Sequence, residues 1–103
     1  MTTTHKKITI GLSGGCELLF NKEASLTLTN VVPAGATVSD LIGILQRDYI
    51  KERPHLFADA AGANVLPGIL ILVNDCDAEV LGGVAYVLED GDEVEFVSTL
   101  HGG

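Results

Sequence analysis

One stretch of helical periodicity in the middle of the chain restricts the fold more than any other feature. Thr37 is suited to cap a helix, and Asp40 follows three positions later, where its charge meets the positive end of the helix. The apolar residues of this stretch recur at helical spacing: Val38, Leu41, Ile42, Leu45 and Tyr49. Pro54 forbids continuation much beyond Arg53. We therefore expect one main helix of about four turns.

The segments before this helix show strand patterns. Residues 8–12 alternate between apolar and small or polar side chains, as in a half-buried strand. A turn at 13–15 precedes a second apolar run at 16–20, so we expect a hairpin. Residues 25–29 either extend this second strand or form a short strand of their own.

Three further strand candidates follow the helix. Residues 69–73 are continuously apolar and β-branched at alternate positions, which predicts a strand covered on both faces. Residues 86–88 form a short apolar piece between turns. The last strand should run from 93 to about 99, with Val94 and Phe96 in the core and Glu93 and Glu95 facing outward.

This order predicts an α+β fold, in which a mixed sheet of four to five strands packs on one main helix. The first and last strands can be neighbours only if they run parallel, because the hairpin occupies the other edge of the first strand. With 103 residues, 47% of them hydrophobic, the chain is expected to be a single domain over 1–103 with a flexible tail at 99–103.

Charge and hydropathy exclude several classes of function. The formal net charge is −8, and every lysine and arginine lies at or before Arg53. Phosphate backbones repel such a surface, so we expect no direct nucleic-acid binding. A basic protein partner near the C-terminal half and simple solubility explain the acidity equally well. The longest apolar segment, 65–73, is interrupted by Pro67 and Gly68 and is much shorter than the ~20 residues of a membrane helix, so we expect no membrane span and a soluble, intracellular protein.

The chain offers little catalytic chemistry of its own. Cys16 and Cys76 do not have the spacing of a redox or zinc motif, so we interpret both as free structural thiols. The three histidines, His5, His55 and His101, are too far apart to suggest a metal site. Residues 11–15 lack the Lys-Ser/Thr ending of a phosphate loop. We therefore expect no catalytic residue, no metal and no permanently bound cofactor.

The last two residues, in contrast, suggest a chemical role. Gly102 and Gly103 carry no side chain beside the terminal carboxylate, and their backbone can become fully extended at little steric cost. Such a tail can pass through a narrow enzyme channel and present its terminal carbon for reaction.

Residues 96–103 resemble the end of the ubiquitin-related modifier family, eukaryotic sulfur carriers whose chains typically close on Ser-Thr-Leu-His-Gly-Gly. The order of elements resembles the β-grasp fold of ubiquitin-like proteins. Four further segments agree with the family pattern: 14–20, 51–57, 67–69 and 73–75. Members usually have tryptophan where this chain has Ala78 and arginine where it has Leu66. These departures concern partner contacts around the two positions rather than the carrier role.

The resemblance implies a function for Gly103. A ubiquitin-activating-type enzyme with a rhodanese-like domain would adenylate and thiocarboxylate it, so that ATP and the sulfur donor act through the partner. A separate thiolase would transfer the sulfur to the wobble uridine of transfer RNA, and the same glycine would form isopeptide bonds with lysines of target proteins. The implied location is the cytoplasm, with the nucleus as a second compartment.

Two sets of contact residues are expected. Thr99, Leu100, His101 and Gly102 would lie in the partner's groove, with His101 as a binding contact rather than a general base. The second set is a candidate docking patch of Leu18, Leu19 and Phe20, because a strand there would place at least one apolar side chain on the outer sheet face.

Two alternatives stay open on the residues alone. The first is another sulfur carrier that ends in Gly-Gly, either the small subunit of molybdopterin synthase or the thiamine-pathway carrier. The second is a ubiquitin-like module that binds partners without covalent chemistry. A residue added after Gly103 would leave such a module active but would inactivate a carrier.

Overall fold

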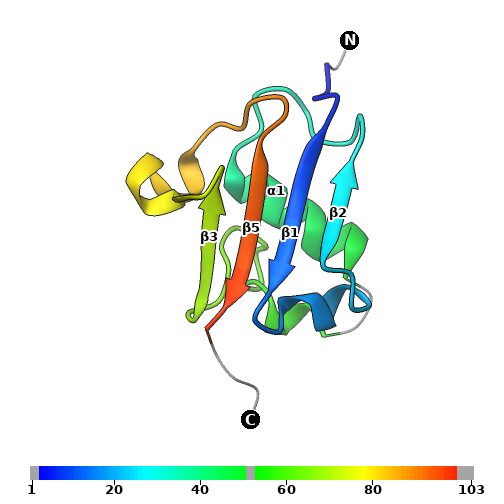
Figure 1. Ribbon diagram of the computed structural model, residues 1–103, viewed down its shortest axis with the longest axis vertical. Coiled ribbons are helices and arrows are strands. Elements are labelled where there is room, and N and C mark those ends of the chain that lie inside the picture. The colour runs from blue at the N-terminus through cyan, green and yellow to red at the C-terminus, as the bar shows by residue number, and fades with distance from the viewer. Residues whose placement is uncertain (1–2, 51–52, 100–103) are drawn as a thin grey trace.

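The computed structural model describes residues 3–50 and 53–99. A mixed five-stranded sheet has the strand order β2-β1-β5-β3-β4, and the helix α1 crosses one of its faces (Figure 1). The strands are β1 (Ile8–Ser13), β2 (Ser25–Leu28), β3 (Ile69–Val73), β4 (Cys76–Asp77) and β5 (Glu93–Ser98). The helical segments are η1 (Cys16–Phe20), α1 (Val38–Ile44), η2 (Leu45–Tyr49), η3 (Pro54–Leu56), η4 (Ala78–Leu81) and η5 (Gly83–Ala85). None of the described helices has the length and apolarity to cross a membrane.

The first and last strands are parallel neighbours at the centre of the sheet, as predicted. β1 is paired antiparallel with β2 on one side and parallel with β5 on the other, with Ile10 opposite Val94 and Leu12 opposite Phe96. β5 is also paired antiparallel with β3. Because side chains alternate between faces along a strand, these apolar pairs all lie on the face that α1 covers.

The core fills the space between the sheet and α1. The rings of Phe20 and Phe96 contact Phe57 from two sides, with centroid distances of 5.4 and 5.3 Å and edge-on geometry. Val94 and Phe96 are fully buried, as expected. The central phenylalanine therefore joins η1, β5 and the segment after the helix in one cluster.

The helix begins as predicted. The Thr37 side chain accepts a hydrogen bond from the Asp40 backbone N–H, and the Asp40 carboxylate accepts one from the Thr37 N–H, which together form a capping box. The end differs from the prediction. The last turn is a π-helix that stops at Tyr49, and Ile50 has an extended backbone, so the helix is shorter than four turns.

The apolar run at 16–20 is a 3-10 helix and not the strand that we expected. Gly14 and Gly15 before it, and Asn21 and Lys22 after it, all have positive φ angles, so the run is closed by tight turns at both ends. Cys16 and Phe20, the first and last residues of this helix, are buried. β2 is therefore a short strand of its own, which resolves the alternative left open for 25–29.

Two predictions after the helix were also wrong. Residues 86–88 form no sheet strand, because Val87 makes only an isolated bridge with Thr37. The short strand is β4, which the left-handed residues Asn74 and Asp75 connect to β3 in a tight hairpin. β3 is covered on one face only, since the fold has a single helical layer and Leu70 on the outer face is 49% exposed.

Candidate functional site

The root of the C-terminal tail is a short region in which three segments meet. Thr99 follows β5 directly, and both its backbone N–H and its hydroxyl donate hydrogen bonds to the carbonyl oxygen of Gly68, at 2.7 Å each. Thr99, which we expected in the tail, is thus held to the loop before β3. The chain leaves the sheet here, at the end away from the N-terminus (Figure 1). The other tail positions, Leu100, His101, Gly102 and Gly103, lie outside the described residues.

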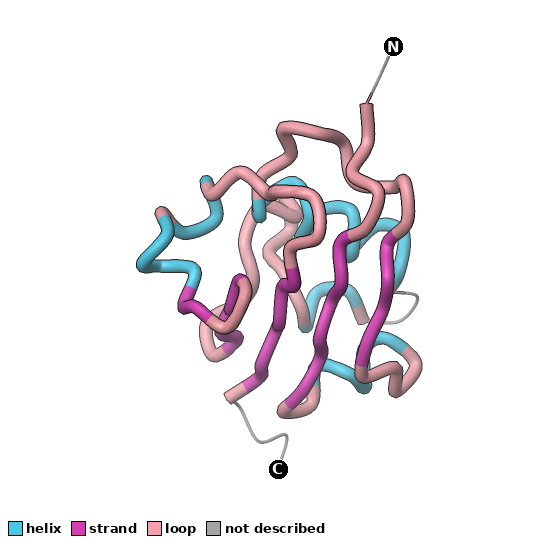
Figure 2. The backbone as a smooth tube through the Cα atoms, turned by 45° about the horizontal axis from the view of Figure 1, so that its top comes forward, coloured by secondary structure: helices cyan, strands magenta, loops and turns pink. Residues whose placement is uncertain are grey.

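Gly14 packs directly against this root. A Cβ atom at Gly14 would lie 2.2 Å from the carbonyl oxygen of Ser98, and its φ of +69° already favours glycine. The contact exists because the parallel pairing places Ser13 beside Val97, so that the turn after β1 and the end of β5 lie together (Figure 2). The sequence identified the turn but not this contact. The expected parallel pairing of the first and last strands was the signal that could have indicated it.

A hollow of about 380 Å³ lies beside the root, between the 14–16 turn, η1 and η3. Leu18 and Leu56 on its rim are 61% and 44% exposed, and Arg53 also lines it. Part of the predicted docking patch is therefore accessible: Leu18 is exposed and Leu19 is half-buried against the core. Phe20 is only 3% exposed, so its place in the patch was wrong, because a helix directs the three side chains differently from a strand.

The thiol of Cys16 lies beside Ser98 but is poorly suited to react. Burial raises its pKa to about 11, and the charge of Glu17 adds to the shift, while a hydrogen bond with the Ser98 backbone acts in the opposite direction. Thiolate is the nucleophilic form of cysteine, so this side chain is inert near neutral pH. Cys76 is half-buried in β4 and its Sγ lies 3.8 Å from the Asp77 carbonyl oxygen.

The outer face of the sheet is acidic. Glu95 on β5 has a raised pKa because it is partly desolvated, and because a hydrogen bond with Asp75 and the charges of Asp75 and Glu93 favour its protonated form. No group of three or more histidine, cysteine, aspartate or glutamate residues within 3–50 and 53–99 has the arrangement to hold a metal ion.

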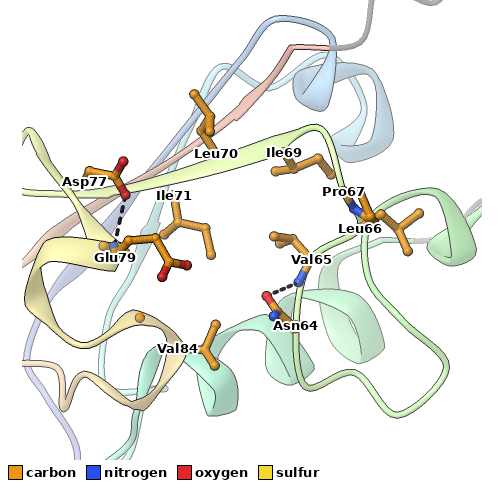
Figure 3. Close-up of a pocket in the computed structure, with 12 residues that line it drawn as sticks. Asn64, Val65, Leu66, Pro67, Ile69, Leu70, Ile71, Asp77, Glu79 and Val84 are labelled. Atoms are coloured by element: carbon orange, nitrogen blue, oxygen red, sulfur yellow. Dashed lines mark hydrogen bonds between the residues drawn. The ribbon is translucent and has the colours of Figure 1, made fainter.

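The two positions that depart from the family pattern line a second hollow. Leu66 and Ala78 both line a pocket of about 300 Å³, which lies on the side of β3 that faces away from β5 (Figure 3). The sequence indicated each position separately and did not indicate that they share one pocket.

Comparisons with known proteins agree on one family. The family model Urm1 (Ubiquitin related modifier) matches residues 7–103. A protein described as ubiquitin-related modifier 1 homolog, from Dictyostelium discoideum, is 45% identical over 101 residues, which cover 94% of this chain and 99% of that protein. The solution structure of Urm1 from Trypanosoma brucei is 57% identical, with a TM-score of 0.82 and coverage of 96% and 97% of the two chains. The small archaeal modifier protein 1 from Methanosarcina acetivorans shares the fold, with a TM-score of 0.71 at 19% identity and coverage of 96% and 98%.

Proposed function

Because the chain belongs to the Urm1 family of ubiquitin-like modifiers and has their β-grasp fold, we propose that it is a sulfur carrier whose Gly103 carboxylate is the reacting group. The observation that carries the proposal is the family match, which extends through the closing Ser-Thr-Leu-His-Gly-Gly residues. The anchoring of Thr99 to Gly68 supports it, since these hydrogen bonds fix the point from which the tail begins.

The chemistry begins at the terminal carboxylate, whose pKa is about 3.5 in an unperturbed chain, so it is ionised near neutral pH. One of its oxygens attacks the α-phosphate of ATP, pyrophosphate leaves, and an acyl-adenylate forms on Gly103. The outer sulfur of a cysteine persulfide on the rhodanese-like donor then attacks the carbonyl carbon and displaces AMP, which leaves an acyl disulfide between Gly103 and the donor. A cysteine thiol of the partner cleaves this S–S bond by forming a disulfide with the donor cysteine, and the outer sulfur stays on Gly103. The product is a thiocarboxylate. ATP and the sulfur donor are bound by the partner, a ubiquitin-activating-type enzyme, and the carrier contributes no catalytic residue.

The sulfur is then transferred by a separate thiolase to the wobble uridine of transfer RNA. The acidic surface supports this division of labour, because a chain with a net charge of −8 is repelled by RNA and leaves nucleic-acid binding to its partners. The activated glycine also forms isopeptide bonds with lysines of target proteins. We place the protein in the cytoplasm, with the nucleus as a second compartment.

The test is the mass of the C-terminal peptide of the protein purified from its own cells. We expect a fraction in which sulfur replaces one carboxylate oxygen, and loss of 2-thiouridine from transfer RNA when the gene is deleted. A variant with one alanine appended after Gly103 is the control, and it should fold normally, carry no sulfur and fail to restore thiolation. If the deletion strain keeps its thiolated transfer RNA, or the extended variant restores it, the carrier proposal is wrong.

A further inference from the structure

The pocket in Figure 3 has features that the carrier function does not use. We call it the Glu79 pocket and define it by Val65, Pro67, Ile71, Glu79 and Val84, which line it together with neighbouring residues of β3 and η4. Its volume of about 300 Å³ is at the lower end of the range for small-molecule sites. A space of this size suits one long side chain better than a cofactor.

The walls combine an apolar surface with one carboxylate. Val65, Ile71 and Val84 direct their side chains into the hollow, and the carboxylate of Glu79 extends toward them from η4 (Figure 3). The backbone N–H of Glu79 donates to Asp77 Oδ1 at 3.0 Å, which orients the residue. A Cβ atom at Gly83 would lie 3.8 Å from Glu79 Oε2, so the carboxylate rests against a position without a side chain.

Among the residues that the structure describes, no cationic side chain pairs with the Glu79 carboxylate. The only salt bridge among the described residues joins Arg47 and Asp48, and no hydrogen bond within 3–50 and 53–99 ends on the Glu79 carboxylate oxygens. The sequence contains no lysine or arginine after Arg53. We therefore look to another molecule for the matching cation.

Lysine and arginine side chains fit both parts of the pocket. Each has an aliphatic stem that packs on apolar surface while its charged end stays at the rim. The three apolar residues would receive the stem, and Glu79 would receive the ammonium or guanidinium group. A negatively charged ligand would be repelled by Glu79 and by Asp77, which also lines the pocket.

The position of the pocket indicates which protein supplies the cation. Pro67 and Ile69 on its rim flank Gly68, whose carbonyl oxygen accepts both hydrogen bonds from Thr99. A protein that seats a side chain in this pocket is therefore beside the root of the tail.

We propose that the Glu79 pocket receives a lysine or arginine side chain of the activating-type enzyme while that enzyme holds the tail. The identity of the partner rests on the proposed function, whereas the preference for a cationic side chain rests on the pocket alone. Two measurements separate these parts.

The first measurement uses the isotopically labelled full chain and the tripeptide acetyl-Val-Arg-Val-amide, with norleucine in place of arginine as the control peptide. We expect saturable NMR shifts at the amides of Val65, Ile71, Glu79 and Val84 with the arginine peptide, and about two- to five-fold weaker binding of the norleucine peptide, which keeps the stem but lacks the charge. Glu79→Gln should weaken binding about two- to five-fold, as for a partly exposed ion pair, whereas Glu23→Gln, an exposed glutamate before β2, should have no effect. Absence of saturable shifts, or equal effects of the two variants, overturns the proposal.

The second measurement is pyrophosphate release by the activating-type enzyme at varied carrier concentration. We expect Glu79→Gln to raise the KM for the carrier about two- to five-fold without changing kcat, because the substitution affects docking and not the reacting atom. An unchanged KM overturns the assignment of the pocket to that enzyme. If the wild-type chain releases no pyrophosphate, the proposed function fails, and the peptide titration still decides whether the pocket binds a cationic side chain.

Discussion

Gly14 connects the turn after β1 with the root of the tail. It combines a left-handed backbone with contact against the end of β5, so two separate physical requirements exclude a side chain there. Some other glycines meet only the first requirement. Gly35, for example, has a φ of +88° but open space around it.

These two glycines make a matched pair for a stability measurement. Gly14→Ala should lower the free energy of unfolding by about 2–4 kcal/mol, from left-handed strain together with steric overlap at Ser98. Gly35→Ala should lower it by about 1–2 kcal/mol, from strain alone. Urea denaturation of the two variants and the wild type gives both values. Equal losses would mean that the turn moves away from β5 without cost.

Cys16 gives the second residue-scale prediction, which concerns pH. Its pKa is raised in the folded chain from the ordinary value of 9.0 to about 11, so the folded state holds the thiol proton more tightly than the unfolded state. The resulting stabilisation is complete below the unfolded pKa and is lost as the pH rises through the folded pKa. In native protein near pH 8, iodoacetamide should therefore modify Cys16 far more slowly than in urea-unfolded protein. Peptide mass spectrometry measures this, and equal rates would contradict the inert thiol.

At the scale of elements, the side chain of Gln46 attaches the continuation of α1 to the following segment. Gln46 Nε2 lies 3.1–3.2 Å from the carbonyl oxygens of Pro54, Ala58 and Asp59, and its two N–H groups serve these three acceptors. Helical periodicity places Gln46 away from the apolar face of the helix, but it does not indicate that the returning chain packs on this side chain. The start of the helix was predictable because capping depends on residues three positions apart.

Gln46→Glu tests this attachment. It replaces a donor by a carboxylate facing carbonyl oxygens, and we expect a loss of about 1–3 kcal/mol of unfolding free energy at neutral pH. The introduced carboxyl should have a raised pKa in the folded state, so part of the loss is recovered as the pH falls and the acid becomes a donor. Gln46→Met, which has neither donor nor charge, is the control and should show no such recovery. Denaturation at neutral and mildly acidic pH distinguishes the two.

At the scale of the whole molecule, one aromatic cluster holds the two layers together. Phe57 contacts Phe20 of η1 and Phe96 of β5, so a segment without regular sheet pairing lies at the centre of the core. The preceding residue, Leu56, is 44% exposed. Phe57 and Leu56 are therefore adjacent in sequence but differ in burial.

We expect Phe57→Ala to remove about 3–5 kcal/mol of stability, which is a large share of the 5–15 kcal/mol typical of small proteins. Leu56→Ala should change it by less than about 1 kcal/mol, since its side chain is half in solvent. Thermal and urea unfolding of both variants check the difference. A small loss at Phe57 would show that the core closes around the missing ring.

The sequence alone determined the features that depend on nearby residues: the alternation of the first and last strands, the capped start of the helix, and the closing residues that indicate the family. It misassigned 16–20, because a short apolar run fits a strand or a helix equally well until its neighbours in space are known. It also misassigned 86–88, where the chain makes only the isolated bridge between Val87 and Thr37. Only the tertiary structure decided that Gly14 abuts Ser98, that Phe20 is in the core, and that Glu79 faces an apolar hollow beside the root of the tail. These contacts join residues far apart in the chain, and the packing of the sheet against the helix brings them together.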